Sequence, residues 1–364
     1  MSLMQLPKIG SIQNIPSIQL SNGKQIELNT DIRPDRIRSL GLLPEQVHQS
    51  PELLAFSEKF LEEFKFVRGG LRDRSWNELQ NKWSQFFNYC LSNQLVPLPA
   101  SHDTVFEYIR LRSKVLHRST LKRDMWAINA IHNAAGFMKP CDDQAIKNFV
   151  KRVSEEQAAN GIFITQAVAL LSIDLDEIEK EFKERRTVQS MRDRAILGLM
   201  FSCLLRGSEL RNVKFEHVDL SRRKLLIPIS KTNHSGEPDI APISTKAAGW
   251  LNEYMTIAGE FGPGDFLFRG VSKYDKLFKS GKKQLSHDAL VGVFHRGFDV
   301  VAYRKSPGRR FSCHSTRVGC CQALWEAGVP LEKIMKLGRW STEEMAYRYG
   351  RAHKVSDDAI ESVM

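Results

Sequence analysis

Two short segments in the second half of the chain each place an arginine near a group that could orient or assist it. In CLLRGSEL, Arg206 follows an apolar run, and Glu209 stands three residues later. In FSCHSTRVG, His314 precedes Arg317 by three residues, a spacing that puts both on one side of a helix. Guanidinium groups are permanently cationic and fork-shaped. Two of them therefore suit the negative charge that gathers on the non-bridging oxygens of a reacting phosphodiester.

A third segment, GRWSTEEMAYRYG, contains a candidate nucleophile, Tyr349, nine residues after Trp340. A tyrosine hydroxyl has a pKa of about 10 and is a poor nucleophile near neutral pH, but neighbouring cations favour the phenolate. Its attack on a phosphodiester would leave a covalent phosphotyrosine and a free hydroxyl. Tyr347 is the rival nucleophile, and a helix would turn the two tyrosines about 200° apart.

The alkoxide that leaves in such a reaction needs a proton. Lys231 begins the polar turn KTNHSGEP between two β-like runs, and from a mobile loop it could deliver that proton. Because arginines would supply the positive charge, this chemistry requires no metal, and we expect no cofactor. Each residue alone also has a structural explanation, since most arginines form salt bridges and most tyrosines pack. The order of the segments favours one shared site.

That order resembles the tyrosine-type site-specific recombinases of the phage integrase family. LLRGSEL is similar to the family's first arginine box, SKTN to its hairpin lysine, HSTRVG to its second box and GRWSTEEMAYRY to its nucleophile segment. The resemblance covers residues 70–355 and includes the helical segment SWNELQNKWSQFFNYC. Trp340 stands where many members of the family carry histidine.

The resemblance implies that Arg206 and Arg317 clamp the scissile phosphate, while Glu209 holds part of this network in place. The full implied catalytic set is Arg206, Glu209, Lys231, His314, Arg317, Trp340 and Tyr349. No metal ligand belongs to it.

Four of these residues would act on protons, on packing or as the nucleophile. The resemblance makes Lys231 the general acid to the leaving 5′ oxygen. His314 would assist proton movement or hydrogen-bond the phosphate. Trp340 would donate its indole N–H or pack the site, and Tyr349 would form the 3′-phosphotyrosine.

The family's activity is conservative site-specific recombination. The resemblance therefore implies that a homotetramer, monomeric when free, cuts and rejoins two inverted-repeat DNA sites through a Holliday junction. Two other classes stay open: a related phosphotyrosine enzyme working alone, such as a type IB topoisomerase or telomere resolvase, and a DNA-binding protein that has lost catalysis. A requirement for paired inverted-repeat sites would separate the first two, and a covalent DNA adduct would exclude the third.

Helical spacing dominates both halves of the chain, so the expected fold is mostly α with a small antiparallel β-sheet. The resemblance implies that this fold is arranged as a two-domain DNA clamp. The β-like runs are Lys224 to Ser230 and Asp239 to Ser244. We expect a loosely ordered N-terminal extension at 1–48, a helical core-binding DNA domain at 49–153, a linker at 154–161 and a catalytic domain with a C-terminal tail at 162–364. Ile360 and Val363 in that tail are expected to dock onto a neighbouring protomer.

Charge supports a polyanionic partner. The 364 residues have a formal net charge of +11 and a pI of about 9.3, which favours nucleic acid first and an anionic membrane surface second. A merely basic soluble enzyme would have the same balance. A run of basic residues without an intervening acid suits duplex phosphates, although a solvated helix face would look alike. The predicted DNA-binding residues are Arg110, Arg112, Lys114, Arg118, Lys122 and Arg123.

Several other classes are disfavoured by what the sequence lacks. No apolar run approaches the ~18 residues of a membrane-spanning helix, and the first residues do not resemble a secretion signal. The six cysteines show no C-x-x-C spacing, so neither a zinc site nor a disulfide framework is implied. Cys320 and Cys321 near His314 could suggest a metal site, but adjacent cysteines rarely ligate one ion well. We expect reduced thiols and a cytoplasmic protein encoded by a bacterium, plasmid or phage.

Overall fold

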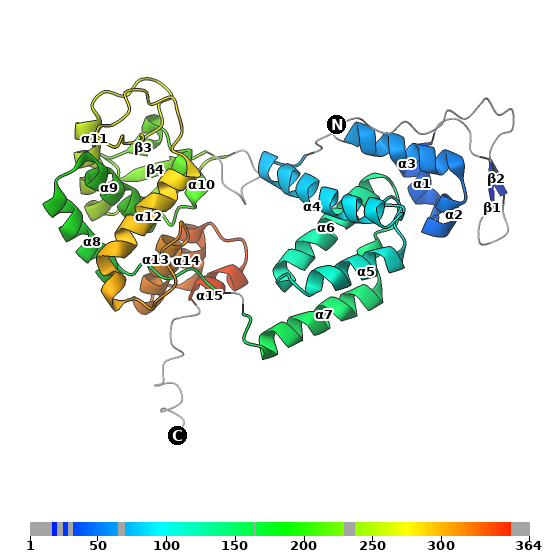
Figure 1. The fold of residues 1–364 in the computed structure, drawn as a ribbon. Helices are drawn as coiled ribbons and strands as arrows, with labels where there is room; N and C mark the ends of the chain where they lie inside the picture. The colour runs from blue at the N-terminus through cyan, green and yellow to red at the C-terminus, as the bar shows by residue number, and fades with distance from the viewer. Residues whose placement is uncertain are drawn as a thin grey trace. The chain divides into compact units, whose positions relative to one another are not determined.

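The computed structural model describes residues 32–64, 70–163, 165–228 and 237–350, together with the backbone of two short strands at 17–19 and 25–27. The chain divides into two compact units, Met1–Ile164 and Thr165–Met364 (Figure 1). Both are mainly helical, and the described strands form one two-stranded and one three-stranded sheet. The prediction of a mostly α fold with a small antiparallel sheet is confirmed.

Unit 1 is built from helices that share apolar clusters. Its elements are β1 (Ser17–Gln19), β2 (Gln25–Glu27), α1 (Pro34–Leu40), α2 (Pro44–His48), α3 (Pro51–Phe64), α4 (Asp73–Ser92), α5 (His102–Ser113), α6 (Arg118–Ala134), the 3-10 helix η1 (Pro140–Asp142) and α7 (Gln144–Ala159). The long helices α4 and α6 pack against each other. Leu79 of α4 and Ile131 of α6 are buried in the same cluster, as their helical spacing predicts.

The expected loose extension at 1–48 is wrong for its last part, because two short helices, α1 and α2, occupy residues 34–48. Each begins with a proline, whose fixed φ suits the first turn of a helix. Ile37 and Val47 are 1% and 0% exposed and belong to the unit 1 core. Two turns of helix are too short to produce a recognisable period, so the pattern looked irregular.

The segment expected as a linker, 154–161, is mostly helical. The helix α7 continues to Ala159, with Val150 and Val153 buried on one face. The side chain of Gln157 accepts from the Arg118 backbone N–H at 2.9 Å, which ties this last part of α7 to the start of α6. Polar composition here marks the solvated face of a helix, and the division between the units falls later, after Ile164.

Unit 2 contains the segments with the candidate chemistry. Its elements are α8 (Ser172–Arg185), α9 (Val188–Ser202), α10 (Gly207–Arg211), the 3-10 helix η2 (Phe215–His217), β3 (Val218–Asp219), β4 (Lys224–Ile227), β5 (Asp239–Pro242), α11 (Thr245–Ala258), α12 (His287–Val301), the 3-10 helix η3 (Ala302–Arg304), α13 (Ser315–Glu326), α14 (Leu331–Gly338) and α15 (Glu343–Gly350). The strands pair in the order β3-β4-β5, all antiparallel. The two predicted β-like runs are therefore strands, while the turn between them, with Lys231, lies outside the described residues.

The helix α9 is the central rod of unit 2. It packs against α8, α11, α12 and α13, and Ile196, Leu197 and Met200 are fully buried. A Cβ at Gly198 would lie 2.4 Å from the ring of Trp250 on α11, so only glycine permits this close contact. A rod buried on all sides holds the residues that follow its end in a fixed place.

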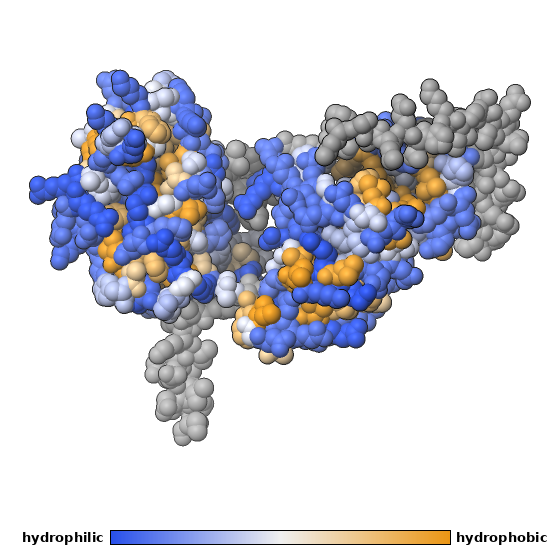
Figure 2. Space-filling view, in the orientation of Figure 1, coloured by the Kyte–Doolittle hydropathy of each residue, from blue (hydrophilic) through white to orange (hydrophobic). Residues whose placement is uncertain are grey.

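Hydrophilic side chains cover most of the visible face of each unit, with apolar patches between them (Figure 2). Among the described residues, no helix is long and apolar enough to cross a membrane.

Candidate active site

Arg206 emerges where the buried rod α9 ends. The chain turns through Leu204, whose φ is 46°, and Arg206 becomes the N-cap residue of α10. The carboxylate of Glu209 accepts from the Arg206 side chain at 2.6 Å and from its backbone N–H at 2.9 Å. Glu209 is 4% exposed. Burial raises the pKa of this carboxyl, but neighbouring guanidinium groups more than offset the effect and leave it below its usual value.

Arg317 lies on α13 and is 0% exposed. One of its terminal nitrogens donates to the carbonyl oxygen of Leu204, and the other donates to that of Gly338 at 2.8 Å. Burial, followed by the charge of Arg206, lowers the pKa of Arg317. A guanidinium nevertheless stays cationic at neutral pH. Arg317 is thus a buried cation fixed between the end of α9 and the end of α14.

The ring of Tyr349 stacks on that of Trp340, with centroids 4.9 Å apart and planes 18° apart. The Arg317 guanidinium lies over both rings, 5.1 Å from the Trp340 centroid and 5.5 Å from the Tyr349 centroid. Tyr347 lies on another side of α15, where it stacks on Trp325 and is 52% exposed. The structure therefore places Tyr349, and not Tyr347, beside the buried arginine.

The two remaining predicted catalytic residues are His314 and Lys231. His314 is exposed and is the N-cap residue of α13, one turn before Arg317. Lys231 lies outside the described residues. The structure thus brings Arg206, Arg317 and Tyr349 to one place, where they contact Glu209 and Trp340. His314 lies on the same helix as Arg317, at the N-terminus of α13.

Sequence reasoning missed one charged residue of this site, Arg339. It donates to the Glu209 carboxylate at 3.0 Å, and its side chain is 7% exposed. Its neighbour Trp340 was singled out, but nothing in the spacing of GRW predicts that the arginine turns inward. The signal lies in the backbone, because Arg339 has a φ of 53° and closes α14 in a left-handed conformation.

The thiols of Cys203, Cys320 and Cys321 near this site are buried. Burial raises the pKa of Cys203 and of Cys320 to about 12 and that of Cys321 to about 11. In the part of the chain that the structure describes, no group of three or more histidine, cysteine or acidic side chains could hold a metal ion.

The predicted DNA-binding run lies at the junction of α5 and α6, but most of its arginines have protein partners. Arg110 is paired with Glu107, Arg123 with Glu78, and Arg118 donates to backbone carbonyls near the end of α7.

Arg112 is held by the buried carboxylate of Asp124, which also binds Lys82 at 2.9 Å. Lys114 and Lys122 are exposed and make no ion pair with another described residue. These two lysines are therefore the members of the run that are free to meet phosphates.

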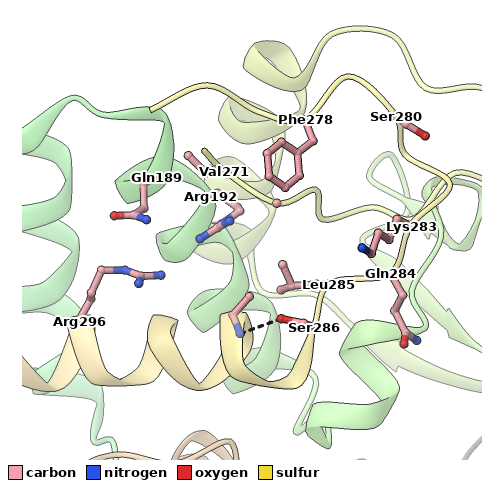
Figure 3. A pocket seen from close by; sticks show the side chains of 12 residues that line it. Gln189, Arg192, Val271, Phe278, Ser280, Lys283, Gln284, Leu285, Ser286 and Arg296 are labelled. Atoms are coloured by element: carbon pink, nitrogen blue, oxygen red, sulfur yellow. Dashed lines mark hydrogen bonds between the residues drawn. The ribbon is translucent and has the colours of Figure 1, made fainter. Parts of the chain in front are cut away.

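A cavity of about 350 Å³ opens elsewhere in unit 2, between the start of α9, the start of α12 and the loop before it (Figure 3). Arg192 and Arg296 project into it, but both are paired with the carboxylate of Asp193, at 2.7 and 2.6 Å. None of the predicted catalytic residues lines this cavity.

Comparisons with known proteins agree with this arrangement. Residues 172–355 match the model of the phage integrase family. The recombinase Cre of Escherichia phage P1, the relative that the sequence motifs resemble, is 26% identical over 295 residues, which span 78% of this chain and 85% of Cre. An integrase/recombinase XerD homolog of Selenomonas ruminantium is 24% identical, over 73% of this chain and 78% of its own.

Solved structures show the same fold at low identity. The Tn1549 transposon integrase aligns with a TM-score of 0.58 and 15% identity, covering 85% of this chain and 99% of that one. The XerH site-specific recombinase aligns with a TM-score of 0.54 and 13% identity, covering 88% and 95%. With half of the sequence matched by the family model, the chain belongs to the phage integrase family of tyrosine recombinases, enzymes that break and rejoin DNA in site-specific recombination.

Proposed function

We propose that this recombinase cuts DNA by attack of Tyr349 on the scissile phosphate, with Arg206 and Arg317 as the phosphate clamp. The observation on which the proposal depends is the stack of Tyr349 and Trp340 beneath the buried Arg317 guanidinium. The stack holds the phenolic side chain of the nucleophile next to this fixed cation. The same cation suits the charge that develops on the phosphate oxygens.

The step is a transesterification. A bond forms between the phenolic oxygen of Tyr349 and phosphorus, and the bond from phosphorus to the 5′ oxygen breaks, leaving a 3′-phosphotyrosine and a free 5′ hydroxyl. Lys231 is the proposed donor of the proton that the 5′ oxygen takes up. The hydroxyl of Tyr349 gives up its proton as its oxygen bonds to phosphorus, and His314 assists this proton movement or hydrogen-bonds the phosphate. Rejoining is the reverse reaction with the 5′ hydroxyl of another strand.

Two buried donors support a site built for a polar substrate. The indole Nε1 of Trp340 and the Nε of Arg317 are buried and have no hydrogen-bond partner among the described residues. Buried donors in native proteins are normally paired, so such atoms call for an explanation. We assign the Trp340 indole N–H to the phosphate, as its place beside Arg317 suggests.

The proposed substrate is a pair of inverted-repeat DNA sites, exchanged through a Holliday junction in a homotetramer. The Tn1549 integrase structures hold transposon right-end and circular-intermediate DNA, and the XerH structure holds a palindromic difH substrate. These structures support a DNA target for this chain, and the palindromic substrate of XerH supports a target with two-fold symmetry. Lys114 and Lys122 of unit 1 are proposed to contact its phosphates.

The test is a nicked suicide substrate, from which the cleaved strand diffuses away and traps the covalent complex. Wild-type protein is expected to become attached to the DNA. Tyr349→Phe should bind the same DNA without forming an adduct, whereas Tyr347→Phe, the matched control, should form it. An adduct in Tyr349→Phe would refute the assignment of the nucleophile.

A further inference from the structure

Arg339 has a backbone conformation that an arginine rarely adopts. It directly follows α14 with φ at +53°, in the left-handed region where a side chain crowds the backbone and glycine is at ease. Its side chain nevertheless turns inward and is 7% exposed. The contacts of the guanidinium must therefore hold the residue in this place.

Those contacts join three parts of unit 2. One terminal nitrogen of Arg339 donates to the carbonyl oxygens of Cys203 at 3.1 Å and Leu337 at 3.2 Å. The other donates to the carbonyl of Leu204 at 2.8 Å and to the carboxylate of Glu209 at 3.0 Å. The single side chain thus fastens the end of α14 to the turn after α9 and to α10.

Two of these acceptors are shared with the proposed phosphate clamp. The Leu204 carbonyl accepts from Arg317 as well as from Arg339. The Glu209 carboxylate is shared in the same way. One of its oxygens accepts from the Arg206 guanidinium. The other accepts from the Arg339 guanidinium and from the Arg206 backbone N–H. Arg339 therefore touches the partners of both clamp arginines.

The charges around Glu209 show what this sharing does. One buried carboxylate faces the guanidinium groups of Arg206 and Arg339, with that of Arg317 close enough to interact electrostatically. If Arg339 were absent, the full charge of Glu209 would fall on Arg206 and draw it away from a phosphate. With Arg339 present, the carboxylate interacts with two cations, so it attracts Arg206 less strongly. The guanidinium of Arg206 then remains available to a phosphate.

We propose that Arg339 is a positioning residue of DNA cleavage. It holds Glu209 and the Leu204 carbonyl so that Arg206 and Arg317 present their guanidinium groups together to the phosphate. This inference rests on the proposed function, since it concerns the same site. It predicts an effect on the rate of the chemical step and not on the affinity for DNA.

Arg339→Gly is the informative substitution, because glycine accepts the left-handed backbone while the guanidinium is removed. The chain offers a matched control in Arg186, which caps α8 with φ at 52° and is exposed to solvent. Arg186→Gly makes the same change of residue and backbone freedom away from the site. Both variants are made in the full-length protein, and thermal unfolding of each is recorded.

The measurement is single-turnover formation of the covalent complex on the nicked substrate, over a series of DNA concentrations. We expect Arg339→Gly to lower the rate at saturating DNA by about 10–100-fold, the scale on which outer partners of a catalytic group act. The half-saturating DNA concentration should change less than twofold, and Arg186→Gly should match wild type. Millimolar guanidinium chloride should restore part of the lost rate, whereas sodium chloride at equal ionic strength should not.

Arg339→Lys gives an independent measurement if the glycine variant is unstable. Lysine keeps the charge but lacks the planar fork that reaches Leu204 and Glu209 together, so its rate should be more than twofold below that of wild type and above that of Arg339→Gly. A saturating rate within twofold of wild type in a folded Arg339→Gly or Arg339→Lys protein would overturn the proposal. So would an equal loss in Arg186→Gly. Failure of the proposed function is recognised separately, because wild-type protein would then form no adduct at Tyr349.

Discussion

The side-chain amide of Gln166 donates to the backbone carbonyl of Tyr349 at 3.1 Å and to that of Arg348 at 2.9 Å. Gln166 is the second residue of unit 2, in the segment that leads from the division between the units to α8. The guanidinium of Arg309 donates to the backbone carbonyl of Gln166. The first residues of unit 2 therefore hold the end of the eight-residue helix that bears the proposed nucleophile.

Replacing this amide should slow cleavage. Gln166→Ala removes two donors from the end of α15, and each hydrogen bond contributes about 1 kcal/mol, or about a fivefold change in an equilibrium. We expect a fall of about five- to thirtyfold in the rate of adduct formation at saturating DNA. Gln166→Glu should be worse, because a carboxylate would face two carbonyl oxygens.

The control is Gln144→Ala, an exposed glutamine at the start of α7. It should leave the rate unchanged. Wild-type cleavage by Gln166→Ala would show that the end of α15 needs no such support.

Much of the site could be predicted from spacing within single helices. The helical period predicts that Tyr349 and Tyr347 lie on different sides of a helix, and α15 places them so. The choice of Tyr349 as the nucleophile rests on its spacing from Trp340. Arg339 and Gln166 could not be found in this way. Their roles depend on a left-handed turn and on contacts between residues far apart in sequence, which no local pattern encodes.

The basic run shows the same limit in unit 1. Between Glu107 and Asp124 the sequence has no acid, yet those two flanking acids pair with Arg110 and Arg112. Glu78 of α4 pairs with Arg123, a contact that depends on the packing of α4 against α6. A basic stretch therefore predicts a charged surface, but tertiary structure decides which of its residues stay available.

The contrast between unpaired lysines and paired arginines in the basic run predicts different effects for residues of the same charge. Lys114→Gln and Lys122→Gln should weaken DNA binding and each reduce the slope of log affinity against log salt by about one. Arg112→Gln should instead destabilise unit 1, because Arg112 is one of two cations that neutralise the buried Asp124. Salt-dependent binding and thermal unfolding measure the two effects. An unchanged salt slope in both lysine variants would rule out their contact with phosphates.

Unit 1 should lose stability in mild acid because of His132. This imidazole is fully buried, and its Nε2 accepts from the Ala100 backbone N–H at 2.9 Å. Burial lowers its pKa to about 4, so the unfolded chain takes up the proton first. Stability is therefore complete above about pH 6.5 and decreases as the pH falls to 4, by about 3 kcal/mol in total.

Hydrogen exchange in peptides of α6, measured between pH 7 and 4 with correction for intrinsic exchange, reports this loss for unit 1 separately. His132→Gln keeps an uncharged acceptor for Ala100 but cannot titrate, so its stability should depend less steeply on pH. His287→Gln, at an exposed position, should behave like wild type. If His132→Gln and wild type lost protection in parallel, the buried imidazole would not be the cause.

The role of Lys231 can be tested through the leaving group. An alkoxide departs poorly, and a general acid typically contributes about 10²–10⁴-fold to such a step. A substrate with sulfur in place of the bridging 5′ oxygen has a much better leaving group that hardly needs protonation. We therefore expect Lys231→Ala to cleave ordinary DNA at least about 100-fold more slowly than wild type and the sulfur-bridged DNA at close to the wild-type rate.

Arg206→Ala and Arg317→Ala are the matched comparisons for this experiment. Their charge is proposed to act on the non-bridging oxygens, so the sulfur substitution should not restore their cleavage. Lys224→Ala, an exposed lysine at the start of β4, should cleave both substrates like wild type. If Lys231→Ala showed the same proportional defect on both substrates, Lys231 would only contact a phosphate or shape the hairpin. The general-acid role would then pass to another residue, and His314, the exposed N-cap residue one turn before Arg317, would be the first to examine.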